Sequence, residues 1–323
     1  MAVDLPLYPQ GAAERDRWIL NQRPQRNALD PHRPYAFHVE RERAASGELV
    51  SIATIFLTNR ECPWRCLMCD LWRNTLTDTV PIGAIPEQIE FALSRLPAAE
   101  QIKLYNSGSF FDVHAIPPAD YETIGSLVKP FQRVIVETHP SLIGDRCLPF
   151  RDLLDGQLEV AMGLETVHPA ALERLNKRMT TAQFAKAAEY LHRNVIDLRV
   201  FILVQPPFIG AEDALSWAQR SVDFAFDCGA TVVSLIPTRA GNGATDRLME
   251  RGDFVPPSLR TLEDALEYGI SLKRGRAFVD IWDIERIATC TQCCKQRVAR
   301  LATMNDSQRV CEKVQCELCG GRD

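Results

Sequence analysis

The stretch Cys62-Pro63-Trp64-Arg65-Cys66-Leu67-Met68-Cys69 decides how the rest of the sequence is interpreted. Its three cysteines have the spacing C-x3-C-x2-C, and the apolar run 52–57 before them predicts a buried strand. Three thiolates on one loop can hold three irons of a four-iron cluster and leave the fourth iron open, whereas ordinary clusters use four cysteines. A small molecule can bind at an open iron. The alternative is a zinc knuckle, but zinc requires a fourth ligand, and Asp70 is a poor candidate.

The composition is typical of a soluble globular protein. The 323 residues are 46% hydrophobic and 24% charged, and one α/β barrel of this length is common. We find no apolar run long enough to cross a membrane and no apolar segment of a signal peptide, so we expect a cytoplasmic protein. The formal net charge of -5 argues mildly against tight, non-specific binding of nucleic acid.

Cysteine is the unusual residue type. The chain has eleven cysteines, and nine of them fall in two clusters. In a chain without an export signal, clustered thiols favour metal or iron–sulfur binding over disulfides. Cys147 and Cys228 stand apart, and we interpret them as packing residues. The second cluster consists of Cys290, Cys293, Cys294, Cys311, Cys316 and Cys319.

Strand and helix patterns alternate from residue 51 onward. This alternation predicts a parallel sheet, and a twisted sheet of this size tends to curl into a partial (β/α)6 barrel similar to a TIM barrel. An open doubly wound sheet is the alternative; in both folds the site lies at the carboxyl ends of the strands. Strands are predicted at 52–57, 101–105, 133–137, 158–164, 198–204 and 231–236, with a possible last strand at 277–281. Helices are predicted at 86–96, 118–128, 146–154, 181–193, 212–227 and 258–273.

The chain divides into an arm (1–50), the partial barrel (51–281) and a cysteine-rich extension (282–323). Arginines give the arm a basic bias. We favour a solvated arm that lies on the barrel, and contact with an anionic substrate is the alternative. The arginines concerned are Arg23, Arg26, Arg33, Arg41 and Arg43.

Polar residues follow several predicted strands. Asn106, Ser107 and Gly108 form a turn after the second strand, where glycine allows a close approach of the backbone and the side chains offer hydrogen bonds. Glu137 and Glu165 end the third and fourth strands, where a carboxylate can accept bonds from ribose hydroxyls or an ammonium group. The alternatives are an ordinary βα turn and solvated loop acids.

Two further features have open interpretations. Gln205 follows the fifth strand, where it either points its amide into the site or forms part of a structural corner with the prolines after it. The cysteines of the extension match the spacing of a zinc ribbon, and an auxiliary iron–sulfur cluster fits equally well. The basic side chains among them indicate either contact with nucleic acid or the solvated surface of a metal site that closes the barrel.

Together these motifs resemble the radical S-adenosylmethionine superfamily, and within it the branch of the archaeosine synthase radical lyase subunit (RaSEA) and the Elongator-type radical domain. The resemblance covers about residues 50–320. The cysteine triad is specific for the superfamily, and the other motifs point to the branch. The stretches that carry the branch resemblance are Tyr105-Asn106-Ser107-Gly108-Ser109-Phe110, Gly163-Leu164-Glu165-Thr166, Leu175-Asn176-Lys177-Arg178-Met179 and Pro206-Pro207-Phe208.

The resemblance implies a radical enzyme with a [4Fe-4S] cluster on Cys62, Cys66 and Cys69. S-adenosylmethionine would complete the open iron and be cleaved to a 5′-deoxyadenosyl radical. Met68 would pack on adenine, where the superfamily often has an aromatic residue. The other residues around this cofactor would be Asn106, Ser107, Gly108, Glu137, Glu165 and Gln205.

The same resemblance implies a lyase acting on a 7-deazaguanine-type nucleoside in tRNA. Its partners would be tRNA, a deazaguanine transferase and an electron donor such as flavodoxin or ferredoxin, with no membrane. One alternative is a radical enzyme that acts on a peptide, a DNA base or a small molecule. The other is a non-catalytic, zinc-binding RNA-binding protein.

Overall fold

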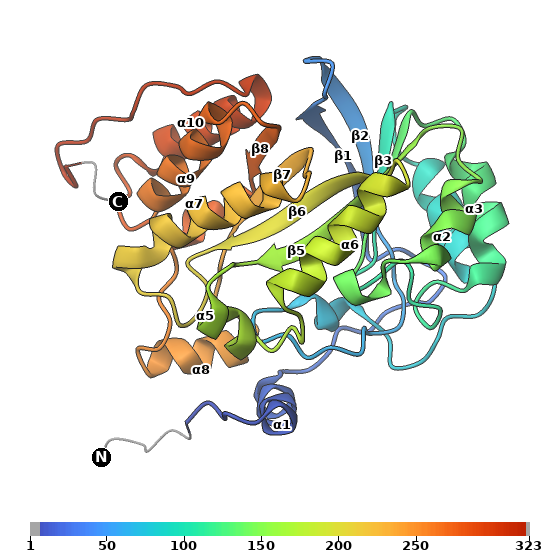
Figure 1. The fold of residues 1–323 in the computed structure, drawn as a ribbon, viewed down its shortest axis with the longest axis horizontal. Helices are drawn as coiled ribbons and strands as arrows, with labels where there is room; N and C mark the ends of the chain where they lie inside the picture. The colour runs from blue at the N-terminus through green and yellow to red at the C-terminus, as the bar shows by residue number, and fades with distance from the viewer. Residues whose placement is uncertain (1–6, 321–323) are drawn as a thin grey trace.

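The computed structural model describes residues 7–320, and these form a half barrel around one curved sheet (Figure 1). Eight strands follow one another across the sheet in chain order. The first pair is antiparallel, and every later pair is parallel. The strands are β1 (Ala36–Arg43), β2 (Leu49–Phe56), β3 (Gln101–Tyr105), β4 (Arg133–Glu137), β5 (Gln157–Glu165), β6 (Asp197–Val204), β7 (Val232–Pro237) and β8 (Arg276–Val279).

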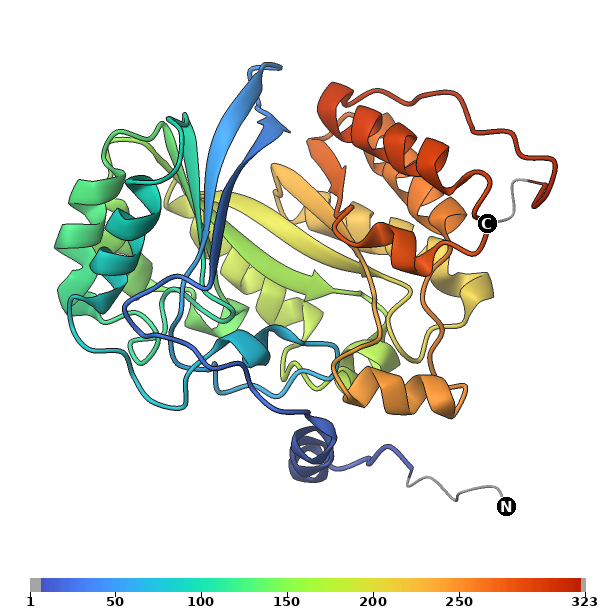
Figure 2. The same ribbon diagram turned by 180° about the vertical axis from the view of Figure 1, so that it is seen from behind.

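Helices cover the convex face of the sheet, as the two opposite views show (Figure 1, Figure 2). The α-helices are α1 (Ala12–Gln22), α2 (Ala84–Leu93), α3 (Tyr121–Val128), α4 (Leu148–Arg151), α5 (Pro169–Arg174), α6 (Thr181–Arg193), α7 (Ala211–Asp227), α8 (Ala244–Glu250), α9 (Leu259–Ser271) and α10 (Cys294–Ser307). Short 3-10 helices lie at Leu71–Asn74, Pro118–Asp120, Pro140–Leu142, Asp145–Cys147 and Ile284–Ile287.

The prediction of a partial α/β barrel is confirmed, and all six predicted strands are present. The possible last strand is β8, so the parallel part is one strand longer than predicted. The stretch 1–50 contains more regular structure than an arm, because β1 pairs with β2 along its whole length. β1 has charged residues at 40–43, which hide the usual apolar pattern of a strand.

Local signals in the sequence place several element ends. The hydroxyl of Thr180 accepts a hydrogen bond from the N–H of Gln183 at 3.2 Å, and the Gln183 side chain accepts one from the N–H of Thr180 at 2.9 Å. This capping box begins α6 at the predicted residue. Gly229 follows α7 with φ of 84°, a conformation that glycine adopts without strain.

Two apolar clusters hold these elements together. The larger cluster lies between the sheet and its helices, and joins strand residues such as Ile102 and Val200 to helix residues such as Ile89 and Phe184. Burying each such side chain contributes about 1.5–3 kcal/mol. The smaller cluster brings α1 and α8 onto the cysteine loop through Leu67, which is fully buried. The cysteine loop is therefore anchored by packing.

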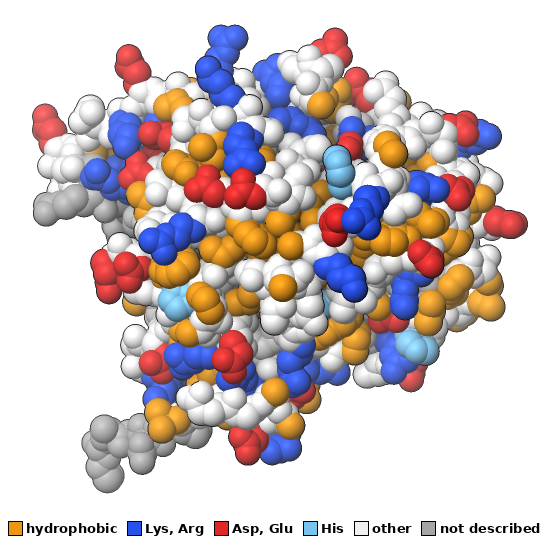
Figure 3. Space-filling view, in the orientation of Figure 1, with side chains coloured by type: hydrophobic (Ala, Val, Ile, Leu, Met, Phe, Trp, Pro, Cys, Tyr) orange, Lys and Arg blue, Asp and Glu red, His pale blue; other side chains and the backbone are white. Residues whose placement is uncertain are grey.

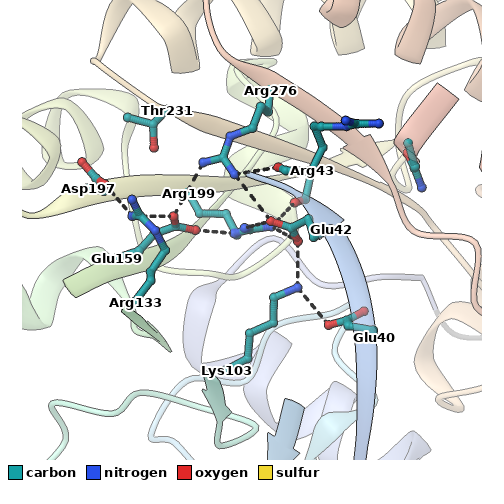
Figure 4. A network of polar contacts seen from close by, with 12 residues as sticks. Glu40, Glu42, Arg43, Lys103, Arg133, Glu159, Asp197, Arg199, Thr231 and Arg276 are labelled. Carbon is teal, nitrogen blue, oxygen red and sulfur yellow. Dashed lines mark hydrogen bonds and ion pairs between the residues drawn. The ribbon is translucent and has the colours of Figure 1, made fainter. Parts of the chain in front are cut away.

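Charged side chains fill the concave side of the sheet towards the amino ends of the strands (Figure 4). Arg199 on β6 binds Glu42 of β1 at 2.5 Å and Glu159 of β5 at 2.6 Å. Lys103 on β3 binds Glu42 at 2.8 Å. Although burial opposes ionisation, Arg199 and Lys103 hold the pKa of Glu42 well below its ordinary value. This network ties β1 to three other strands and leaves the carboxyl ends of the strands for a site.

The surface shows no strongly charged region on the face turned to the viewer in Figure 3. Acidic and basic side chains are interspersed there, with no broad area of one sign. Within residues 7–320, no helix combines the length and the apolar character needed to span a lipid bilayer.

Candidate active site

The cysteine loop lies at the carboxyl edge of the sheet and is clamped from two sides. The side-chain amide of Asn176 donates a hydrogen bond to the carbonyl of Arg65 at 2.8 Å. Asn242 donates to the carbonyls of Leu67 at 2.8 Å and Cys69 at 3.2 Å. The backbone of the loop is thus held by residues far away in the sequence.

Two arginines of the stretch 1–50 form ion pairs with the residue that precedes the cysteine loop. Arg23 and Arg26 both bind Glu61, at 2.7 and 2.6 Å, and Arg65 binds the same carboxylate at 3.1 Å. Glu61 directly precedes Cys62, so these contacts fix the start of the loop. Two of the arm's arginines are thus used inside the protein, which differs from both interpretations of the arm as solvated or substrate-binding.

The thiols of the loop are deeply placed. Burial raises the pKa of Cys62 and Cys69, and raises the pKa of Cys66 to about 12. The charge of each neighbouring thiol adds to the shift at Cys69, so the three groups face one another. Among the described residues they do not form a group with all donor atoms within 4.8 Å, as a shared single ion would require. Ligands to separate iron atoms suit this spread better.

The turn at residues 106–108 contains a buried side-chain amide without a hydrogen-bond partner in the protein. The N–H of Asn106 donates to Oε1 of Glu137 at 2.7 Å, and Glu137 thereby holds the turn. The Asn106 side chain is fully buried, yet neither its amide nitrogen nor its oxygen has a hydrogen-bond partner. An orphaned buried group needs an explanation, and a ligand that binds there is one. Burial raises the pKa of Glu137, despite the backbone N–H groups around it.

Gly108 and Ser107 complete this turn. A Cβ atom at Gly108 would lie 3.2 Å from Cβ of Cys62, so the missing side chain lets the turn pack on the cysteine loop. The Ser107 hydroxyl is 2.9 Å from the hydroxyl of Tyr35, a residue that sequence analysis did not predict at this site. The turn at residues 106–108 therefore packs directly against the cysteine loop.

Glu165 is part of a buried ion pair. Its Oε1 lies 2.5 Å from Nζ of Lys177, and both side chains are at most 10% exposed. A side chain at Gly163 would collide with both charged groups, so the glycine makes room for the pair. The Lys177 ammonium also faces the thiols of Cys66 and Cys62; although burial opposes it, Glu165 and these thiols raise the pKa of Lys177. Lys177 lies in a stretch that carried the family resemblance, but its role was not predicted.

The side chain of Gln205 bonds to a backbone carbonyl of a neighbouring loop, as in the interpretation of a structural corner. Its side-chain nitrogen donates to the carbonyl of Val255 at 2.8 Å, which holds the loop after α8. Ser107, Glu165 and Gln205 all have positive φ, at 52°, 65° and 53°. Strained backbone of this kind costs about 1–3 kcal/mol per residue and concentrates at functional sites. All three residues were predicted from their places at strand ends.

Met68 lines a cavity of about 100 Å³ beside the cysteine loop. Leu203 at the end of β6 and Ile236 at the end of β7 form its apolar walls, and Asn242 contributes a polar edge. Asp70, Thr238 and Arg239 also line the cavity, so its walls are of mixed polarity. Such a cavity can take one face of a ring that carries polar edges, and the orphaned amide of Asn106 can bond a polar ligand, so the residues present are compatible with an adenine-containing cofactor.

His139 and Trp64 join the outer side of the loop to β4. Their rings stack with centroids 3.8 Å apart and planes 9° from parallel. Nε2 of His139 lies 2.9 Å from the carbonyl of Lys177 and must carry the proton, since a carbonyl only accepts. Burial and the Lys177 ammonium lower the pKa of His139 to about 3. Sequence analysis missed this residue because its partners are far away in the chain.

The extension brings together four of its six cysteines. The sulfurs of Cys290, Cys293, Cys316 and Cys319 lie within 4.8 Å of one another. Cys294 and Cys311 were predicted as ligands, but the structure places them against the large apolar cluster instead. Cys294 is the first residue of α10, and Cys311 follows that helix.

The basic residues of the extension are largely used to attach it to α9. Arg297 and Arg300 bind Glu263, and Lys313 binds Asp264 at 2.7 Å. This pairing favours the interpretation of a metal site that closes the barrel over that of a surface for nucleic acid.

Comparison with known proteins agrees with this site. No protein-family model matches the chain. It is 22% identical over 259 residues to an uncharacterized protein of Methanocaldococcus jannaschii, covering 75% of this chain and 71% of that protein. It is 25% identical over 236 residues to archaeosine synthase subunit beta of Methanosarcina acetivorans, covering 68% and 67%. The protein of the same name from Thermococcus kodakarensis is 26% identical over 194 residues, covering 57% and 59%.

A solved structure shares the fold. Elp3 of Methanocaldococcus infernus with its N-terminus deleted matches with a TM-score of 0.50 at 13% identity. The match covers 72% of this chain and 60% of the Elp3 chain. The chain is therefore similar in sequence to archaeosine synthase subunit beta and in fold to Elp3, and its cysteine triad lies at the carboxyl edge of the half barrel.

Proposed function

We propose that the chain binds a [4Fe-4S] cluster through Cys62, Cys66 and Cys69, cleaves S-adenosylmethionine, and acts as a lyase on a 7-deazaguanine-type nucleoside in tRNA. The observation that carries this proposal is the buried amide of Asn106, which has no partner and lies on the turn that packs on the triad. When bound, the cluster and S-adenosylmethionine supply a 5′-deoxyadenosyl radical. The protein's task is to bind, orient and exclude water.

Each residue at the site has a role that follows from its contacts. Glu137 holds the turn so that the Asn106 amide remains available to the amino acid part of the cofactor. The buried ammonium of Lys177 faces the thiols of Cys62 and Cys66, and we assign it to the carboxylate of S-adenosylmethionine. Glu165 keeps that ammonium charged and in place.

The substrate proposal rests on aromatic side chains and on the relatives. Half-buried rings line the concave side of the sheet above the charged network: Phe56 lies 6.1 Å from Tyr105, and Tyr105 lies 6.2 Å from Phe201. Rings of this kind stack well on a base extruded from RNA. The archaeosine synthase subunits to which the chain is similar suggest which base this is.

The proposal is tested with tRNA that carries the lysine-bearing 7-deazaguanine made by a deazaguanine transferase. The reconstituted protein, reductant and S-adenosylmethionine should convert that base to the amidine, detected by mass spectrometry of digested nucleosides. The Cys66→Ala variant should leave the base unchanged. Formation of 5′-deoxyadenosine with an unchanged base would keep the radical chemistry and reject the tRNA substrate.

The electron would reach the cluster from an acidic carrier such as flavodoxin or ferredoxin. A cavity of about 310 Å³ beside α6 is lined by three basic residues, Arg178, Lys186 and Arg193, and also by Glu189 and His139. Arg193 pairs with Glu189 and Arg178 pairs with Asp16, so Lys186 is the basic residue tested here. His139 stacks on Trp64 of the cysteine loop, so the wall of this cavity contacts that loop. Lys186→Glu should slow cleavage driven by flavodoxin and leave cleavage driven by dithionite unchanged. If the variant and the unmutated protein are equally fast with flavodoxin, the carrier does not dock at this cavity.

A further inference from the structure

The four cysteines gathered by the extension have the geometry of a site for one ion. The sulfurs of Cys290 and Cys316 are 3.8 Å apart, and those of Cys293 and Cys319 are 3.7 Å apart. A tetrahedron of sulfurs that each lie about 2.3 Å from a central zinc has edges of about 3.8 Å. We infer that these four cysteines bind a single zinc ion, independently of the radical chemistry proposed above.

An auxiliary four-iron cluster does not fit the same sulfurs. Such a cluster binds each cysteine on a different iron atom, so its core holds the sulfurs well apart. The sulfurs of the extension all lie within 4.8 Å of one another, which leaves room for one ion and no core. The thiols of Cys62, Cys66 and Cys69 do not form such a compact group. The distances between the sulfurs therefore distinguish the two cysteine groups: the compact group fits a single ion, and the wider group fits an iron–sulfur cluster.

Neighbouring groups are arranged to support thiolates. Nε of Arg297 donates to the sulfur of Cys293 at 3.3 Å, and Glu263 holds the Arg297 guanidinium from the other side. A hydrogen bond from the protein to a bound thiolate is the usual outer-shell support of a zinc site. α10 begins at Cys294, and the positive end of its dipole faces the same sulfurs.

The helix that starts at this site bridges the open seam of the half barrel. The side-chain amide of Asn305 bonds to both the N–H and the carbonyl of Val279, at 2.9 and 2.8 Å. Gln308 bonds in the same way to Ala277, at 2.9 and 2.8 Å. These two amides cover the outer edge of β8, while Arg43 of β1 donates to the carbonyl of Asp306 at 2.5 Å.

The zinc would therefore act as a staple: it would hold α10 in place across the gap between β8 and β1. Both ligand pairs join residues 26 positions apart, so the ion ties the segment after α10 back to the start of the helix. Residues 309–320 have no regular secondary structure and are largely exposed. Arg300 and Asp264 hold residues 311–313, and the zinc would hold the part of the segment beyond them. Closing the segment with a metal restricts the unfolded chain and stabilises the folded one.

Metal content of the full chain tests the inference. A Cys62→Ser, Cys66→Ser, Cys69→Ser variant removes the iron of the loop and should still contain about one zinc and no sulfide-bound iron per chain. Adding Cys316→Ser should remove the zinc, whereas the matched change Cys311→Ser should retain it. Iron with acid-labile sulfide in the triple variant, no metal at all, or equal zinc in the Cys316→Ser and Cys311→Ser proteins would overturn the inference.

Two measurements keep the test decisive if a variant folds poorly. X-ray absorption at the zinc edge of the unmutated protein should show four sulfurs at about 2.3 Å, and oxygen or nitrogen ligands would contradict the site. Removal of zinc by a chelator should raise hydrogen exchange in α10 and residues 309–320, with α6 unchanged as the internal control. Unchanged exchange in α10 would reject the staple.

Discussion

The indole of Trp64 lies flat against the imidazole of His139, with ring centroids 3.8 Å apart. One ring belongs to the cysteine loop and the other follows β4, so the stack fixes the loop to the sheet. The neutral imidazole is required, because Nδ1 accepts from the N–H of Ser141 at 3.2 Å while Nε2 donates to Lys177. The stack thus depends on the protonation state of a buried histidine.

His139 makes the apo protein sensitive to acid. Its pKa is about 3 when folded and about 6.5 when unfolded, so the unfolded chain gains a proton first as the pH falls. Stability from this group is complete above about pH 6.5 and is lost progressively towards pH 3, by at most about 1.4 kcal/mol per pH unit. His139→Phe keeps a ring on Trp64 and should show a smaller fall in Tm between pH 7 and 4.5. Parallel Tm curves for the two proteins would contradict this assignment.

Lys177 provides a buried positive charge at the cofactor site. Lys177→Met should weaken binding of S-adenosylmethionine to the reconstituted protein at least about tenfold, because a charge-assisted hydrogen bond contributes about 1.5–3 kcal/mol. Lys129→Met, the same change at an exposed lysine, is the control. Binding is measured by anaerobic calorimetry. If affinity stays the same while Tm falls, Lys177 serves only as the partner of Glu165.

Gly108 should be required for cluster assembly. The Cβ of Gly108→Ala would meet Cβ of Cys62 at 3.2 Å, which pushes the cysteine loop away from the turn. We expect lower iron content after reconstitution at limiting iron, with little change in helix content by circular dichroism. Gly144→Ala is the matched control, since nothing lies within 4 Å of its added methyl group. Equal iron in both variants would show that the loop does not depend on this contact.

Glu42 should be a main determinant of stability. Glu42→Gln leaves Arg199 and Lys103 without their shared carboxylate, and losing one partner of a buried pair costs about 3–5 kcal/mol. Glu40→Gln, at a site 39% exposed, should cost about 1 kcal/mol or less.

The effect of Glu42→Gln should depend on pH. The folded pKa of Glu42 is lowered, so its contribution is present above about pH 4.3 and fades as the pH falls through the folded value. Urea denaturation at pH 7 and pH 4 measures both effects. A cost as small as that of Glu40→Gln would mean that the network is not cooperative.

Strongly patterned elements were predictable from the sequence. Helix α6 has the predicted bounds, since a capping box and an amphipathic pattern agree there. β1 was missed because its inward side chains are charges that pair across the barrel, so the usual apolar alternation is absent.

The candidate site was predictable only in part, for a related reason. Asn106 and Glu165 were predicted from their places after strands, because parallel strands bring their carboxyl ends together. Met68 was predicted from its place before the third cysteine of the loop, and the cofactor roles of all three stay predictions. Lys177 and Asn242 were missed because their contacts depend on how distant loops fold over the edge of the sheet. Likewise, spacing alone could not separate Cys294 and Cys311 from the four converging cysteines, because their distances depend on how the segments before and after α10 fold.

The most direct test of the central claim is the amount of 5′-deoxyadenosine formed per chain. Protein reconstituted anaerobically to about four irons and reduced with dithionite should convert S-adenosylmethionine to 5′-deoxyadenosine and methionine. Cys311→Ser should do the same, and Cys66→Ala should form none. A fully loaded protein that forms no 5′-deoxyadenosine, or a Cys66→Ala variant that forms as much as the unmutated chain, would contradict the account.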